Sequence, residues 1–130
     1  PQEQPLASLL EALALETEQI FGCVCRYEPT AFVLPLPTER AANCYYVARE
    51  ALQNAVRHGR ASHTEIELNL QGDQLVLTVR DNGSGFDTAD DADGLGLRSM
   101  AHRARLLDGE LTVHSKPGEG SCVRLTIPCE

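Results

Sequence analysis

The sequence predicts an α+β fold, a two-layer α/β sandwich in which helices cover one face of a mixed, mostly antiparallel sheet. Two stretches, residues 6–21 and 39–58, repeat apolar side chains at the spacing of amphipathic helices. The strands come in hairpin pairs, 64–70 with 74–80 and 110–115 with 121–128. Strands that pair in this way do not alternate one-for-one with helices, as they would in a wholly parallel sheet.

The first half of the chain predicts a helix, a strand and a second helix. Residues 6–21 place leucines on one helical face and glutamates on the other, and CVCRYE (23–28) is typical of a short strand. Thr38 is a residue type that caps helix N-termini, so the second helix is expected from about residue 39 to His58, with Gly59 ending it. Its core stripe is Cys44, Val47, Ala48, Ala51, Leu52, Ala55 and Val56.

The second half predicts two hairpins separated by a loop and a helix. Gly72-Asp73 is expected to join the first two strands as a two-residue turn. Residues 81–96 are rich in glycine and aspartate and predict a loop, and a helix follows from about 97 to 107. The whole chain, 1–130, is expected to be one domain with its core at about 23–128 and a lead-in helix over 1–22.

Composition and charge exclude several classes of function. The net charge is -8 and the basic residues are scattered, so nucleic acid is not an expected partner. No apolar run approaches the roughly 20 residues of a membrane span, and no signal-peptide pattern is present, so no direct membrane contact is expected. The five cysteines are expected to be reduced. Cys23 and Cys25 form a C-x-C pair, but no second pair stands at the spacing of a zinc site.

Two polar groups on either side of the first hairpin are candidates for chemistry. Glu50, Asn54 and His58 follow one another at four-residue intervals, so they line one side of the second helix and need either solvent or a ligand. Asp81 ends a strand and leads into a turn in which Gly83 and Gly85 permit close backbone approach. A carboxylate there can accept a hydrogen bond from the exocyclic amine of adenine; the alternative is an ordinary Asn-Gly turn.

A third candidate is the segment DGLGLRSM, in which Gly94 and Gly96 open directly into a helix. The free N–H groups and the dipole of a helix N-terminus favour phosphate. A Rossmann fingerprint is excluded because Ser99 stands where a third glycine is due, and a Walker A loop is excluded because no G-K-[ST] occurs. A helix start without a ligand, or a hinge for the preceding loop, remain alternatives.

Four segments in this order resemble the GHKL (Bergerat) ATPase superfamily: REALQNAVRH (49–58), DNGSGF (81–86), DGLGLRSMAHRA (93–104) and GEGSCVRLTIP (118–128). Within it the chain looks most like the ATP-binding catalytic domain of nitrate-sensor-type histidine kinases, over about residues 39–128. The lid of this sequence, which runs from Phe86 to Asp93, is short and rich in aspartate.

The resemblance implies a role for each matching residue. Glu50 matches the acid that orients or deprotonates the attacking group, Asn54 matches a Mg²⁺ ligand, and Asp81 matches the adenine-binding aspartate. Further nucleotide contacts are implied for His58, Gly83, Gly85, Gly94, Leu95, Gly96, Leu97, Arg98 and Ser121, with Arg57 as another neighbour of the phosphates.

The resemblance also implies a reaction and its partners. ATP with Mg²⁺ would donate its γ-phosphoryl group to a histidine on a dimerisation domain, for relay to a response regulator. The chain's own four histidines match no phosphoacceptor helix. The alternatives are an anti-sigma-factor-type serine kinase of the same fold and a non-catalytic nucleotide-binding regulatory module. The fragment is expected to be monomeric and the full-length kinase homodimeric, in the cytoplasm, either free or as the cytoplasmic part of a membrane-anchored kinase.

Overall fold

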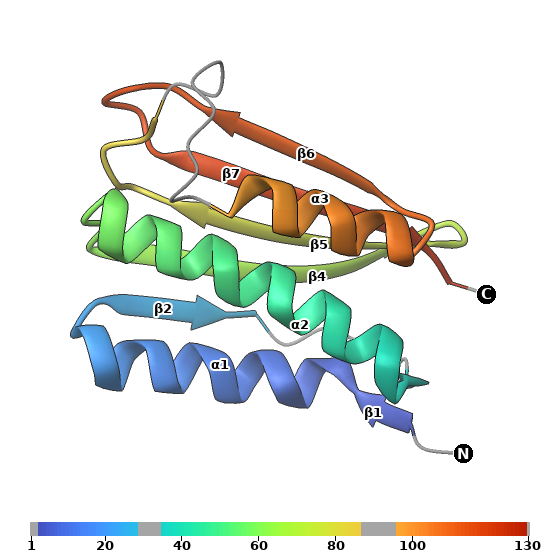
Figure 1. The fold of residues 1–130 in the computed structure, drawn as a ribbon. Coiled ribbons are helices and arrows are strands. Elements are labelled where there is room, and N and C mark those ends of the chain that lie inside the picture. The colour runs from blue at the N-terminus through green and yellow to red at the C-terminus, as the bar shows by residue number, and fades with distance from the viewer. Residues whose placement is uncertain (1–2, 29–34, 87–95, 130) are drawn as a thin grey trace.

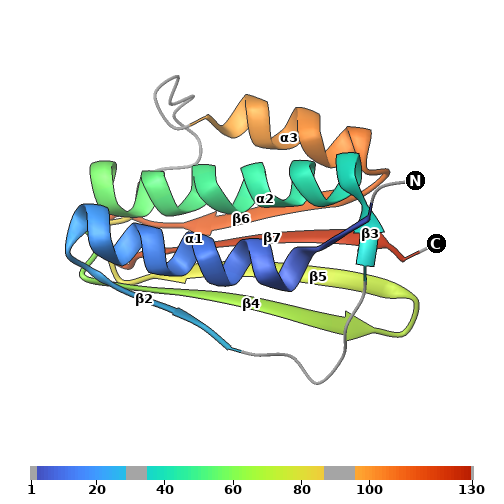
Figure 2. The same ribbon diagram turned by 90° about the horizontal axis from the view of Figure 1, so that it is seen from below.

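Three helices lie side by side on one face of a five-stranded sheet in the computed structural model, which describes residues 3–28, 35–86 and 96–129 (Figure 1). They are α1 (Leu6–Phe21), α2 (Thr38–Gln53) and α3 (Leu97–Leu106). The view from below shows all three on the same side of the sheet (Figure 2). The predicted two-layer α+β sandwich is confirmed. No helix in the described part of the chain has the length and apolar character needed to cross a bilayer.

The large sheet is mixed and mostly antiparallel, as predicted. Its strands are ordered β2-β4-β5-β7-β6, and only β2 and β4 pair in parallel among its described strands. Their bounds are β2 (Val24–Tyr27), β4 (His63–Gln71), β5 (Gln74–Asp81), β6 (Glu110–Ser115) and β7 (Ser121–Pro128). The hairpin pairing that the alternating patterns predicted is therefore confirmed in both halves.

A second, two-stranded sheet pairs β1 (Glu3–Pro5) with β3 (Pro35–Pro37). Sequence analysis missed it, because prolines are depleted in strands and these two strands are rich in them. The two strands stand immediately before α1 and α2, so their pairing brings the starts of these helices together (Figure 1).

The start and end of the second helix differ from the predicted ones. Thr38 is the first helical residue, Pro37 occupies the N-cap position in an extended conformation, and no side chain caps the helix. The prediction of Thr38 as N-cap is therefore wrong; Pro37 ends β3 and the helix starts directly after it. At the other end α2 stops at Gln53 and continues as one π-helical turn, η1 (Asn54–His58). Gly59 follows this turn, as predicted.

The hydrophobic core lies between the helices and the sheet. Leu10 of α1, Leu52 of α2 and Met100 of α3 are each at most 1% exposed. They belong to one core cluster with residues of the central strands such as Ile66 and Leu77, which are 0% and 2% exposed. Burying each such side chain contributes about 1.5–3 kcal/mol, so this layer holds α2 over the end of β5, where the candidate site lies.

Cys44 belongs to this core, and its burial makes a prediction about reactivity. It is 1% exposed, and desolvation raises the pKa of its thiol to about 12. Because the thiolate is the reactive form, iodoacetamide at about pH 8 is expected to spare Cys44 in the native protein while it labels the partly exposed Cys122. Peptide mass spectrometry measures both sites, with the guanidinium-unfolded protein as the control in which both react. Equal labelling of the two in the native protein would contradict the burial of Cys44.

Candidate functional site

The candidate site lies at the end of the sheet where three connections meet. These are residues 59–62 after η1, 82–86 after β5, and 116–120 between β6 and β7 (Figure 1). The Ser84 N–H donates to the Gly59 carbonyl oxygen at 2.8 Å, which ties the first two connections together. The Phe86 N–H donates to Ser115 Oγ at 2.8 Å at the end of β6, where the third begins. The fold thus brings the end of the long helix next to the DNGSGF segment.

Asp81 is the last residue of β5 and is half-buried. Its Oδ1 accepts a hydrogen bond from the Gly83 N–H at 2.8 Å, and its backbone pairs with Ser121 of β7. Burial raises the pKa of the Asp81 carboxyl, while the Gly83 and Ser121 backbone donors lower it. Within the described residues the ion pair joins Arg80 and Glu67, so no cationic side chain neutralises Asp81 there. A carboxylate offers about four acceptor positions, which leaves room for a further donor.

Gly83 and Gly85 are required by close backbone packing. A Cβ atom on Gly83 would stand 2.7 Å from the Gly59 carbonyl oxygen. Gly85 has a φ of +69°, and a Cβ atom there would overlap the carbonyl oxygen of Lys116. Real Cβ atoms do not approach backbone oxygens so closely, so both positions exclude side chains. The glycines that sequence analysis singled out for ligand approach therefore also hold the three connections against each other.

Asn54 and Glu50 lie at the junction of α2 and η1. Asn54 is only 8% exposed, and its carbonyl oxygen accepts the Gly59 N–H at 3.0 Å, the five-residue spacing of a π-helix. Such single π-turns are frequent at functional sites. Glu50 is half-buried, whereas His58 is exposed, so the predicted row runs from a partly covered carboxylate through a buried amide to a solvated imidazole.

Gly96, at the start of α3, contacts the helix that carries Glu50. It precedes α3 in the left-handed conformation, and a Cβ atom on it would stand 2.5 Å from Glu50 Oε2. The Glu50 carboxylate therefore packs directly against the start of α3. It also lines a polar hollow of about 260 Å³ between α2 and α3, whose other lining residues are Tyr46, Arg49, Gln53, Ser99, Met100 and Arg103.

The remaining residues predicted to contact nucleotide lie in several different places. Gly94 and Leu95, and the aspartates of the predicted lid, lie outside the described residues. Leu97 packs partly buried against the core, and Arg98 is exposed at the start of α3. Ser121 Oγ lies 2.8 Å from Ser115 Oγ. The Arg57 guanidinium extends toward α1, where it lies 5.6 Å from the centre of the Phe21 ring.

Sequence analysis missed Asn82, which clamps two of the connections together. Its Oδ1 accepts hydrogen bonds from the Ser62 and His63 N–H groups, both at 3.0 Å, and its Nδ2 donates to Ser62 Oγ at 3.0 Å. These partners lie 19 and 20 residues away in the sequence. The only local signal was the Asn-Gly pair itself, which indicates a turn but not its tertiary partners.

Comparisons with known proteins agree on one family. Residues 40–130 match the family described as "Histidine kinase-, DNA gyrase B-, and HSP90-like ATPase". The chain is 34% identical over 85 residues to the signal transduction histidine-protein kinase/phosphatase DegS of Brevibacillus brevis, which covers 65% of this chain and 22% of that protein. It is 31% identical over 113 residues to the oxygen sensor histidine kinase NreB of Staphylococcus carnosus, covering 85% and 33%. The chain thus spans a third or less of these relatives.

Solved structures share the fold. The histidine kinase domain of the Erythrobacter litoralis EL346 blue-light activated histidine kinase superposes with a TM-score of 0.80 at 27% identity, over 96% of this chain and 61% of that one. The ATP binding domain of PrrB from Mycobacterium tuberculosis superposes with a TM-score of 0.82 at 21% identity, over 99% and 97%. The second likeness concerns the fold alone.

Proposed function

This chain belongs to the family of histidine kinase-, DNA gyrase B- and HSP90-like ATPases, and we propose that it is the catalytic domain with which a sensor histidine kinase binds Mg-ATP and phosphorylates a histidine. The observation that carries the proposal is that the segment after Asp81 is hydrogen-bonded to Gly59, at the end of the helix that carries Glu50 and Asn54. The named relatives are sensor histidine kinases, which favours this function over a serine kinase of the same fold.

Asp81 is suited to binding adenine. Its carboxylate is held by the Gly83 N–H and has acceptor positions left for an exocyclic amine. Guanine presents a carbonyl oxygen at the corresponding ring position, and two acceptors facing each other in a half-buried site would both lack a donor. Asp81 therefore selects ATP and ADP over guanine nucleotides.

Asn54 and Glu50 would act at the phosphate end. An amide oxygen such as that of Asn54 is a hard ligand of the kind that Mg²⁺ takes, and Asn54 is buried at the start of η1, one turn after Glu50. A bound Mg²⁺ neutralises the charge on the phosphates. Glu50, pressed against Gly96, stays next to the N-terminus of α3 and there orients the attacking imidazole or accepts its proton.

The phosphoryl acceptor would lie on a separate part of the kinase. We propose a histidine on a dimerisation domain as the acceptor and a response regulator as the next recipient. The full kinase would be a homodimer in the cytoplasm, and this domain alone a monomer. Its contribution to the reaction would consist of positioning and electrostatic stabilisation, because phosphoryl transfer requires little covalent chemistry from the protein.

Two variants separate the roles of the two helix residues. Asn54→Ala is expected to weaken Mg-ATP binding roughly tenfold or more, because the metal loses a ligand. Glu50→Gln is expected to keep the ATP affinity while slowing histidine phosphorylation by about 10²-fold or more. Calorimetric titration measures the first in this domain, and phosphohistidine formation measures the second in the full-length kinase. Asn69→Ala, an exposed amide on β4, is the control.

Two results would contradict parts of this proposed function. If the unmodified domain shows no heat with Mg-ATP and ADP displaces nothing, the chain is not a working ATP-binding domain, although its fold remains. If Glu50→Gln phosphorylates its histidine at the unmodified rate, Glu50 has no part in the transfer step.

A further inference from the structure

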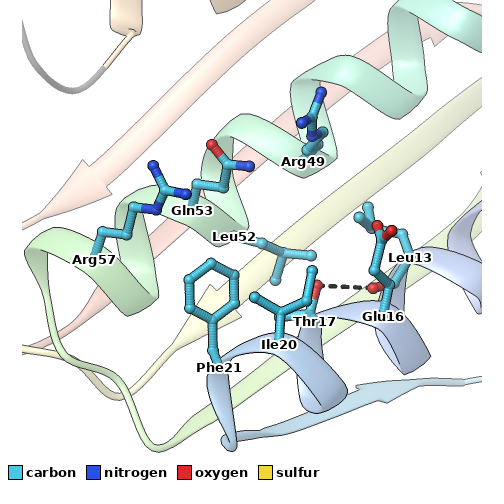
Figure 3. A pocket seen from close by; sticks show the side chains of 9 residues that line it. All are labelled: Leu13, Glu16, Thr17, Ile20, Phe21, Arg49, Leu52, Gln53 and Arg57. Carbon is cyan, nitrogen blue, oxygen red and sulfur yellow. Dashed lines mark hydrogen bonds between the residues drawn. The ribbon is translucent and has the colours of Figure 1, made fainter.

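A groove between α1 and α2 shares Arg49 and Gln53 with the hollow that Glu50 lines, but none of its α1 residues is a predicted nucleotide contact (Figure 3). Its cavity is about 170 Å³, and the two helices that bound it run side by side over the sheet (Figures 1 and 2). The apolar lining consists of Leu13, Ile20, Phe21 and Leu52. The polar lining consists of Glu16 and Thr17 from α1 and of Arg49, Gln53 and Arg57 from α2 and η1.

The apolar part of the groove continues onto an exposed surface. Ile20, which lines the groove, is 65% exposed. Leu52, which also lines it, is 1% exposed and belongs to the core, so the floor of the groove is rigid. Thr17 does not compete for a ligand, because its hydroxyl donates to the Leu13 carbonyl oxygen at 2.7 Å. Exposed apolar side chains beside an apolar-floored groove are typical of a protein interaction surface.

Positive charge lines one rim of the groove. Arg49 and Arg57 are both exposed and are separated by eight residues, which is roughly 12 Å along a helix. The Arg57 guanidinium lies 5.6 Å from the centre of the Phe21 ring, which holds it over the groove. Although the chain has 19 acidic residues, the ion pair within the described segments is Arg80–Glu67, so neither rim arginine has a carboxylate within 4.0 Å there.

We propose that this groove docks an amphipathic helix of a protein partner. The partner's apolar stripe sits on Ile20 and Phe21, and two of its carboxylates, seven or eight residues apart, face Arg49 and Arg57. Gln53 lies between the two arginines, and Glu16 on the opposite rim favours a neutral or basic flank there. This charge asymmetry sets the direction in which the helix lies. Hydrophobic grooves commonly bind the apolar face of an amphipathic helix, and two separated cations favour a ligand with two separated anions.

The test uses synthetic helical peptides of about 18 residues, long enough for two such carboxylates. One peptide carries a leucine stripe with two glutamates eight residues apart on one flank, and its partner carries lysines in their place. The protein contains no tryptophan, so a single tryptophan in each peptide reports binding by fluorescence. The acidic peptide is expected to bind with a Kd of roughly 10–100 μM and the lysine peptide at least about tenfold more weakly.

Charge-reversal variants then test whether the peptides bind at the two rim arginines. Arg49→Glu with Arg57→Glu is expected to reverse the order of the two peptides, while Arg105→Glu, an exposed arginine on α3, keeps it. Ile20→Ser, at a largely exposed position, is expected to weaken both peptides without unfolding the domain. Ile20 is not a predicted nucleotide contact, so ATP titration of Ile20→Ser keeps the two proposals separate. The arginine variants do not serve this purpose, because Arg49 also lines the hollow beside Glu50 and Arg57 is a predicted neighbour of the phosphates.

Three outcomes would overturn the docking proposal. The first is equal binding of the two peptides, or none. The second is concentration-dependent dimerisation of the domain that the rim variants abolish, which would assign the groove to a second copy of this chain. The third is a decanoate anion that binds the groove when neither peptide does, which would make it a site for small apolar anions.

Discussion

Asp81→Asn is expected to lower the affinity for ATP by about 100-fold, or roughly 2.7 kcal/mol, while the domain stays folded. The asparagine oxygen can still accept the Gly83 N–H that Asp81 accepts at 2.8 Å. The second carboxylate oxygen is replaced by an NH₂ group. This group and the adenine amine, both hydrogen-bond donors, would then face each other. The loss of a hydrogen bond to a charged group, with a buried donor left unpaired, accounts for an effect of this size.

The same variant makes a prediction about stability and pH. Burial raises the pKa of Asp81 above its usual 3.8, so the folded protein holds this proton more tightly than the unfolded chain. Stability from this group is therefore greatest at low pH and declines as pH rises through the window between 3.8 and the raised value. Asp81→Asn lacks this decline and is expected to be at least as stable as the unmodified domain at neutral pH.

Urea denaturation of both proteins across this pH window measures the difference, and ATP titration at the same pH values measures binding. Binding should weaken as pH falls through the raised pKa, because the amine needs the ionised carboxylate. Asp73→Asn, at the exposed turn between β4 and β5, is the control and should alter neither quantity. If the unmodified domain gained stability over Asp81→Asn as pH rose through the window, the burial of Asp81 would be contradicted.

Gly85→Ala is expected to cost about 3 kcal/mol or more of the free energy of unfolding. Two costs combine there: an alanine at a φ of +69° is strained, and its Cβ overlaps the Lys116 carbonyl oxygen. Left-handed backbone costs a residue with a Cβ roughly 1–2 kcal/mol, and overpacking typically adds 1–3 kcal/mol. Because the overlapping atom belongs to backbone, no side chain can rotate away to relieve it.

Gly118→Ala is the matched control for this prediction. Its φ is +84°, but a Cβ atom there meets nothing within 4 Å. Only the conformational cost of about 1 kcal/mol is then expected. Chemical denaturation of the two variants measures the difference, which isolates the close approach of residues 82–86 to the β6–β7 connection. Equal costs for the two substitutions would show that this approach is not tight.

The sequence by itself determined the order and type of the main elements and the predicted roles of Asn54 and Asp81. Helical and strand periodicities are local, so α1 and α3 could be predicted within windows of ten to sixteen residues, and each strand of the two hairpins within a shorter window. The candidate roles came from short ordered segments that resemble one family, and they stay proposals.

Only the tertiary structure decided how those segments meet. Sequence periodicity cannot predict that Asn82 bonds to Ser62, that Arg57 lies over Phe21, or that Gly96 contacts Glu50. In each case the partner lies far away in the chain. Even the start of α2 depended on a proline-rich strand, β3, whose paired residues in β1 lie 30 to 34 residues earlier. Contacts between distant residues arise only when the core packs, because burial of the apolar faces is what holds the elements in one arrangement.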